Sequence, residues 1–133
     1  MRIFADTNIV VYAESDDGEK SKRAQAIVES FPIISTQVVN EAIAALTRKY
    51  SFSRPDAYEI ATSLMDLCEV VSVEQGTIRE AMRLAIRYQL SHWDALIVAA
   101  ALGAGCDVLY SEDMQQDQVF DGQLTIKNPF INY

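Results

Sequence analysis

Four acidic residues stand where predicted strands end or predicted helices begin. Asp6 and Asp113 each follow a short apolar run that is typical of a buried strand. Asp94 falls in the first turn of a predicted helix, and Glu41 falls in the second turn of another. In open parallel sheets, ligands bind outside the carboxyl ends of the strands, where the helices also start. We therefore expect these four carboxylates to share one edge of a sheet.

Carboxylates gathered at one edge repel one another and need a counter-charge. At about 5 Å and an effective dielectric constant of about 20, one like-charged pair costs roughly 3 kcal/mol. All the pairs among four ionised groups would cost on the order of 20 kcal/mol before solvent screening, whereas a typical domain is stable by roughly 5–15 kcal/mol. Protons or metal ions must relieve this repulsion. Oxygen ligands without nearby Cys or His predict Mg²⁺ or Mn²⁺ rather than Zn²⁺.

Each acid also has an ordinary structural explanation. Asp6 is placed as a loop or helix-capping residue would be, and Ser91 with Asp94 forms the pattern of a capping box. Glu41 would serve equally well as a solvated helix position. The shared placement favours the metal site, because independent accidents should not all fall on one edge.

Strand-like runs alternate with helical stretches along the whole chain. Apolar residues recur at spacings of three and four behind Pro55 and again after Thr36, which we interpret as an N-cap. Alternating strands and helices imply a parallel sheet covered on both faces. We expect one α/β domain over residues 1–133, with about five parallel strands flanked by helices. The predicted strands are Ile3–Ala5, Ile33–Ser35, Val70–Val73, Val108–Tyr110 and Leu124–Lys127.

Two further helices are predicted in the second half of the chain. The run Ala95–Leu102 has no polar side chain on any face, so it should be buried all round and end at Gly103 or Gly105. Before it, an apolar stripe predicts the packed face of another helix. The stripe consists of Ile78, Met82, Ala85 and Ile86.

The chain carries a formal net charge of −8, which by itself argues against a nucleic-acid partner. A bound divalent ion would reverse the local sign, so this argument fails if some carboxylates are metal ligands. We recognise no signal peptide, and the longest apolar run is too short to cross a bilayer. Cys68 and Cys106 lie among apolar neighbours, which suits a reducing compartment. We expect a cytoplasmic protein with no membrane partner.

Three parts of the sequence carry a family resemblance. They are FADTNIVVYAES, SHWDALIVAAAL and the pair LYSEDMQ and FDGQLTIKNPF. These look like the motifs of PIN-domain ribonucleases, in particular the VapC toxins of toxin–antitoxin pairs, and the similarity covers nearly the whole chain. The resemblance implies a parallel five-stranded sheet with an acidic site at the strand carboxyl ends. It matches Asp6, Glu41, Asp94 and Asp113 to the family's acidic quartet.

The resemblance also implies an activity and its partners. One Mg²⁺ or Mn²⁺ ion, held chiefly by Asp6, Asp94 and Asp113, would activate a water for phosphodiester hydrolysis. Glu41 would complete the coordination or take the proton. The expected substrate is structured RNA such as transfer RNA, cut in a single-stranded loop. The other expected partners are a cognate antitoxin and a second copy of the chain in a homodimer.

Other polar residues are matched less directly. Thr7, Asn8 and Ser111 correspond to family positions that orient ligands or water. Many relatives carry a further acid where this chain has Gln115, and Asp117, about one turn later, is its nearest substitute. The loss of that ligand puts a second metal ion in question, but not the first.

A basic stripe raises a separate question. Arg79, Arg83 and Arg87 repeat every four residues, roughly opposite the apolar stripe. A solvated helix face paired with nearby acids is the ordinary interpretation, and contact with RNA phosphates is the alternative. His92 and Trp93 stand beside Asp94, and we interpret them as a capping or packing residue and a core or interface anchor.

Functions from other classes stay open. A phospho-receiver domain is also a small acidic α/β fold that binds Mg²⁺, and IKNPF resembles its Lys-Pro-Phe sequence. It needs adjacent acids after its first strand, however, where ADTN supplies only Asp6, and an acceptor Asp that VVSVEQ lacks. A haloacid-dehalogenase phosphatase needs a second Asp at the position of Asn8. A PIN-like interaction scaffold without catalysis is the third alternative.

Overall fold

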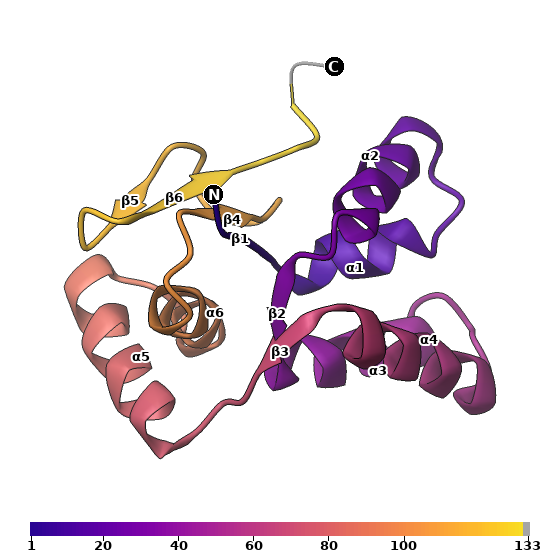
Figure 1. Ribbon diagram of the computed structural model, residues 1–133, viewed down its shortest axis with the longest axis horizontal. Helices are drawn as coiled ribbons and strands as arrows, with labels where there is room; N and C mark the ends of the chain where they lie inside the picture. Colours follow the sequence, from indigo (N-terminus) through magenta and orange to yellow (C-terminus); the bar gives the residue numbers. More distant parts are fainter. Residues whose placement is uncertain (132–133) are drawn as a thin grey trace.

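A computed structural model describes residues 1–131, which fold around a six-stranded sheet (Figure 1). The strand order is β3-β2-β1-β4-β6-β5, and every neighbouring pair is parallel except β5 with β6. The predicted α/β class is confirmed, and the short antiparallel β5 is added to the five predicted strands. The strands are β1 (Ile3–Ala5), β2 (Ile33–Ser35), β3 (Glu69–Val71), β4 (Val108–Tyr110), β5 (Val119–Phe120) and β6 (Leu124–Lys127).

Helices cover both faces of this sheet, as predicted. In Figure 1, α1 to α4 lie on one side of the strands, and α5 and α6 lie on the other. This arrangement follows from the connections, because crossovers between parallel strands are right-handed. The crossovers from β1 to β2 and from β2 to β3 carry α1 to α4 over one face of the sheet. The chain then returns in the opposite direction across the sheet, from β3 to β4, and this crossover carries α5 and α6 over the other face. The helices are α1 (Thr7–Ala13), α2 (Gly18–Glu29), α3 (Thr36–Arg48), α4 (Arg54–Leu67), α5 (Gln75–Tyr88) and α6 (His92–Gly103).

Helix α6 is the central helix of the core. Its residues 95–101 are all buried, which confirms that the apolar run is covered on every side. Gly105 ends it, with a φ of +72°, while its neighbour Cys106 donates its N–H to the carbonyl of Ala101. A left-handed residue at this position favours glycine. Leu102 is only partly buried.

Within residues 1–131, no helix is both long and apolar enough to cross a membrane.

The predicted packed face of α5 is wrong for three of its four residues, whereas Ala85 is partly buried and packs against the core. Ile78, Met82 and Ile86 are 42%, 57% and 77% exposed, whereas Ala81 and Leu84 are buried on the side of α5 that packs against α6. Helical spacing identifies an apolar stripe but does not say whether the protein's own core or solvent lies against it. A stripe of large apolar side chains that faces solvent is typical of an interface.

One helix start also differs from the prediction. The N-cap of α3 is Ser35, whose side chain accepts from Val38 N, and not Thr36. Thr36 is the first helical residue, and its hydroxyl instead accepts the backbone N–H of Val73. The shift by one residue places the start of α3 directly at the end of β2. That connection fixes the helix that carries Glu41 against the same edge of the sheet as Asp6.

Candidate functional site

Asp6 leaves the sheet at the carboxyl end of β1 and caps α1. Strands β1 and β4 pair with Ala5 opposite Tyr110, so Asp6 and Ser111 emerge side by side. The Asp6 carboxylate accepts from Thr7 N at 2.6 Å and from the Ser111 hydroxyl at 2.8 Å. Asp6 is 6% exposed and Ser111 is fully buried. Asp6 is therefore a helix cap and a buried carboxylate at once, with its orientation fixed by two donors.

The other acids are held by side chains from neighbouring elements. The Thr7 hydroxyl donates to Glu41 at 3.2 Å, and the Gln37 amide donates to the second oxygen of the same carboxylate. The Asn8 amide donates to Asp113 at 3.0 Å. Thr7 and Asn8, the first two residues of α1, thus link the carboxylate that follows β1 to those of α3 and of the segment after β4. The role expected for them, to orient ligands or water, stays a prediction.

All four acids line one pocket of about 220 Å³ at the carboxyl edge of the sheet. Asp6 is at its buried end, Glu41 and Asp94 are partly buried, and Asp113 is exposed. Asp94 is carried by the first turn of α6, where its N–H donates to the side chain of the N-cap Ser91 at 3.1 Å. The remaining lining residues are Thr7, Asn8, Val11, Tyr12, Ala45, Lys49, Tyr50, Trp93 and Ile97.

The electrostatics of the pocket disfavour the ionised forms of two of its acids, Asp6 and Asp94. Burial raises the pKa of Asp6 to about 6, with repulsion from Asp94 and Asp113 adding to it and the Ser111 and Thr7 hydrogen bonds opposing it. Burial also raises the pKa of Asp94, and repulsion from Asp113 and, more weakly, from Glu41 raises this pKa further. These shifts show that the acids interact electrostatically, and a cation in the pocket would reverse them.

The donor atoms suit a hard divalent cation. All four acids present oxygen, and neither the imidazole of His92 nor a thiol lines the pocket. The buried Oδ1 atom of Asn8 has no hydrogen-bond partner within residues 1–131, so one oxygen is left for a ligand. Among residues 1–131, however, no three Asp, Glu, His or Cys side chains converge closely enough to hold an ion as they stand. The chemistry therefore fits Mg²⁺ or Mn²⁺, and binding would require the more exposed acids to close inward.

Other residues singled out from the sequence lie outside this pocket. Asp117 has a positive φ of 67°, is exposed and pairs with Lys127, so it does not join the acids as a substitute ligand. Arg83 pairs with Glu80 and Asp121, as the ordinary interpretation of the basic stripe expected. Arg87 lies 5.3 Å from the centre of the Tyr88 ring. Arg79 is exposed, and none of the three arginines lines the pocket.

Sequence reasoning missed several lining residues. Tyr12 is one helical turn beyond Asn8, so the spacing of α1 could have indicated it. Its hydroxyl donates to Glu112 at 2.7 Å, and Lys20 pairs with the same carboxylate. Of the residues that the structure describes, Lys49, just beyond the end of α3, is the one cationic side chain that lines the pocket. In the sequence it belongs to a small basic patch with Arg48 and Arg54, but that pattern does not place it beside the acids.

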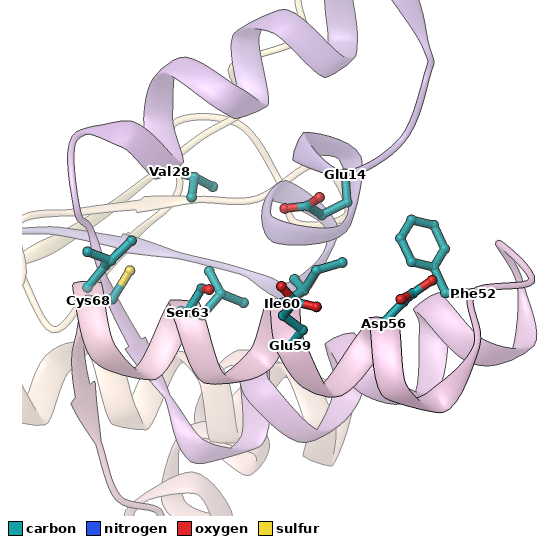
Figure 2. A pocket seen from close by; sticks show the side chains of 10 residues that line it. Glu14, Val28, Phe52, Asp56, Glu59, Ile60, Ser63 and Cys68 are labelled. Atoms are coloured by element: carbon teal, nitrogen blue, oxygen red, sulfur yellow. The ribbon is translucent and has the colours of Figure 1, made fainter.

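A second and larger cavity, of about 420 Å³, shares no lining residue with the acidic pocket. Figure 2 shows the side chains that line it. Side chains of α4 point toward the end of α1, at Glu14, and toward Val28 of α2. The walls are mostly apolar, and carboxylates are interspersed among them. The lining residues are Glu14, Val28, Phe52, Asp56, Glu59, Ile60, Ser63, Leu64, Leu67 and Cys68.

A family model described as the PIN domain matches residues 3–120, which is most of the chain. The chain belongs to the PIN-domain family. The resemblance drawn from the acidic motifs is thereby confirmed. The strand order of this PIN domain also differs from the 2-1-3-4-5 order of receiver-like folds, which removes the receiver alternative. The phosphatase alternative fails at Asn8, which binds Asp113 instead of supplying a second acid.

Solved structures of toxins share this PIN fold. The VapC20 toxin of Mycobacterium tuberculosis, described as cleaving the sarcin–ricin loop, has a TM-score of 0.70 and 21% identity, covering 84% of this chain and 89% of its own. A toxin–antitoxin complex from Klebsiella pneumoniae has a TM-score of 0.71 and 20% identity, covering 98% of both chains. VapBC2 of Rickettsia felis, bound to promoter DNA, has a TM-score of 0.69 and 15% identity, covering 96% and 100%. No curated protein matches the sequence significantly.

Proposed function

We propose that this PIN domain is a metal-dependent endoribonuclease and the toxin of a VapBC-type toxin–antitoxin pair, acting in the cytoplasm. The observation that carries the proposal is the single pocket that Asp6, Glu41, Asp94 and Asp113 line together. The fold shared with toxins, one of which is described as cleaving an RNA loop, supports RNA as the substrate. A PIN scaffold without catalysis would be served as well by a neutral Asn at position 6, because Asn caps a helix as well as Asp and carries no buried charge.

The reaction is hydrolysis of a phosphodiester bond by water. When bound, Mg²⁺ or Mn²⁺ supplies a bound water of lowered pKa and positive charge opposite the phosphate oxygens. Asp6, Asp94 and Asp113 would hold it, with Asp6 kept in place by Thr7 and Ser111. Glu41, held by Thr7 and Gln37, completes the coordination or accepts the proton of the attacking water.

Metal removal tests this proposal directly. The purified protein should cleave RNA with Mg²⁺ or Mn²⁺, stop when EDTA is added, and resume when the ion is restored in excess. The physical reason is that the pocket alone offers negative charge to a negative substrate, so only the ion can bring the two together. A gel assay with transfer RNA and with ribosomal RNA fragments measures it. Cleavage that is unchanged in EDTA would contradict the metal mechanism.

We propose that the cognate antitoxin binds the larger cavity, through a segment with an apolar face and Lys or Arg side chains. Glu14, Asp56 and Glu59 would attract the cations, while Leu67, 60% exposed, would pack against the apolar face. Lys in place of Leu67 repels such a segment, so Leu67→Lys should weaken the complex at least about tenfold, or about 1.4 kcal/mol. Calorimetry with the product of a short neighbouring reading frame measures it.

Met65 offers the matched control on the same helix. It is 48% exposed but does not line the cavity, so Met65→Lys should leave the affinity unchanged. An equal loss of affinity in both variants, or no loss in either, would place the antitoxin elsewhere.

We also expect a homodimer. The exposed stripe of α5 (Ile78, Met82, Ile86) is the candidate interface, and light scattering of the purified protein would report the dimer.

A further inference from the structure

Trp93 is not the core residue that its type suggests. It is the one Trp of the chain, it is the second residue of α6, and its side chain is 62% exposed. Trp side chains are well buried on average, so an indole that faces solvent beside a functional pocket needs an explanation. The next residue along α6 is Asp94, one of the four acids.

The surroundings of the indole point to a ligand that also reaches the acids. Trp93 lines the acidic pocket together with Asp94, and it lines an adjoining shallow hollow with Gln37 and Glu41. The ring of His92 meets it edge to face, with the ring centres 5.8 Å apart and an interplanar angle of 66°. Tyr50 lines the same pocket and supplies a further aromatic ring.

Because the protein is strongly acidic, its affinity for RNA depends on contacts other than those with phosphates, and an aromatic side chain can supply one. The net charge is −8, and Lys49 is the one cationic side chain among the pocket residues, so phosphate contacts supply little affinity. Aromatic rings stack on any unpaired base, because every base has a π-face, whereas a duplex hides those faces.

We propose that Trp93 stacks against an unpaired base beside the scissile phosphate and thereby makes the site select single-stranded RNA. This inference rests on the proposed nuclease function and assigns to Trp93 the recognition of a substrate base. The indole provides the platform at the rim, and the carboxylates act on the neighbouring phosphodiester.

The single Trp allows a direct measurement. In the Asp6→Asn protein with Mg²⁺, in which the RNA should stay intact, fluorescence of Trp93 should be quenched saturably by a short single-stranded RNA of mixed sequence. The same strand annealed to its complement, and an abasic ribose-phosphate strand of equal length, should quench at least about fivefold more weakly, since neither offers an accessible base.

Kinetics on otherwise wild-type protein provides the second readout. Trp93→Ala should raise KM for single-stranded RNA by about 5- to 100-fold with kcat nearly unchanged, and Trp93→Phe should recover most of the loss. Tyr58, an aromatic residue of α4 that is 50% exposed and lines neither cavity, is the matched control, and Tyr58→Ala should have no effect.

The outcomes separate this inference from the nuclease proposal. Cleavage with no quenching, equal quenching by all three probes, or unchanged KM in Trp93→Ala would overturn the stacking role while the nuclease stands. A Trp93→Ala variant that changes only its oligomeric state would assign the indole to a protein interface. Quenching confined to the single strand, in a protein that cuts no RNA, would keep the base contact and remove the nuclease.

Discussion

Replacing Asp94 with Asn should lower the rate of metal-dependent RNA cleavage at least about 100-fold while the protein stays folded. Removing even a residue that only supports a metal ligand typically costs 10- to 100-fold, and Asp94 is proposed as a ligand itself. Asn has nearly the same shape, and the contact from Asp94 N to Ser91 uses the backbone and is retained. The measurement is the initial rate of cleavage at saturating Mg²⁺, with circular dichroism to verify the fold.

Asp117 provides the matched control for this substitution. It is an exposed Asp that pairs with Lys127 and does not line the acidic pocket. Asp117→Asn makes the same chemical change and should leave the cleavage rate within about twofold of wild type, since a surface ion pair contributes little. Wild-type cleavage by Asp94→Asn, or an equal loss in both variants, would remove Asp94 from the proposed site.

Replacing Asp6 with Asn should stabilise the metal-free protein by about 1–3 kcal/mol at pH 7. Burial raises the pKa of Asp6 from 3.8 to about 6, which corresponds to roughly 3 kcal/mol between the two protonation states. At pH 7 the folded protein must hold the ionised form, whereas Asn is neutral. Asn is also as good an N-cap for α1 and can keep the contacts with Thr7 and Ser111. Urea unfolding in EDTA measures the difference.

The pH dependence of this effect has a defined sign. Because the pKa of Asp6 is raised on folding, its protonated form favours the folded state below about pH 4, and this contribution is lost as the pH rises through about 6. The two proteins should therefore be about equally stable at pH 4 and diverge toward pH 7. Adding Mg²⁺ should stabilise wild type more than Asp6→Asn, by mass action. An Asp6→Asn protein that is less stable in EDTA at every pH would contradict this account.

The buried helix and the acids at its edge could be predicted from sequence because local patterns determine them. The run from Ala95 has no polar face, so only burial suits it, and Ser91 marks where the helix begins. Asp6 and Asp113 follow β1 and β4, and parallel strands bring their carboxyl ends together. These features depend on secondary structure and on one topological rule, and not on detailed packing.

The features that the sequence did not reveal depend on contacts between distant segments. The apolar stripe of α5 has the same spacing whether it faces the core or solvent. In the same way, the residue type of Trp93 does not say whether its side chain is buried or exposed. Asp117 is close to Asp113 in sequence, but its left-handed backbone and its pairing with Lys127 direct it elsewhere. Lys49 lines the same pocket as the acids because α3 packs against α1. Periodicity and spacing contain no information about such contacts.

The central claim is that four carboxylates from distant segments of the chain form one site for a divalent ion. Anomalous diffraction from a crystal soaked in Mn²⁺ tests it most directly. The account predicts a manganese peak in the pocket, bonded to oxygens of Asp6, Asp94 and Asp113, with Glu41 beside it. A saturating soak that leaves this pocket without a peak, or that places manganese only at other acids, would contradict it.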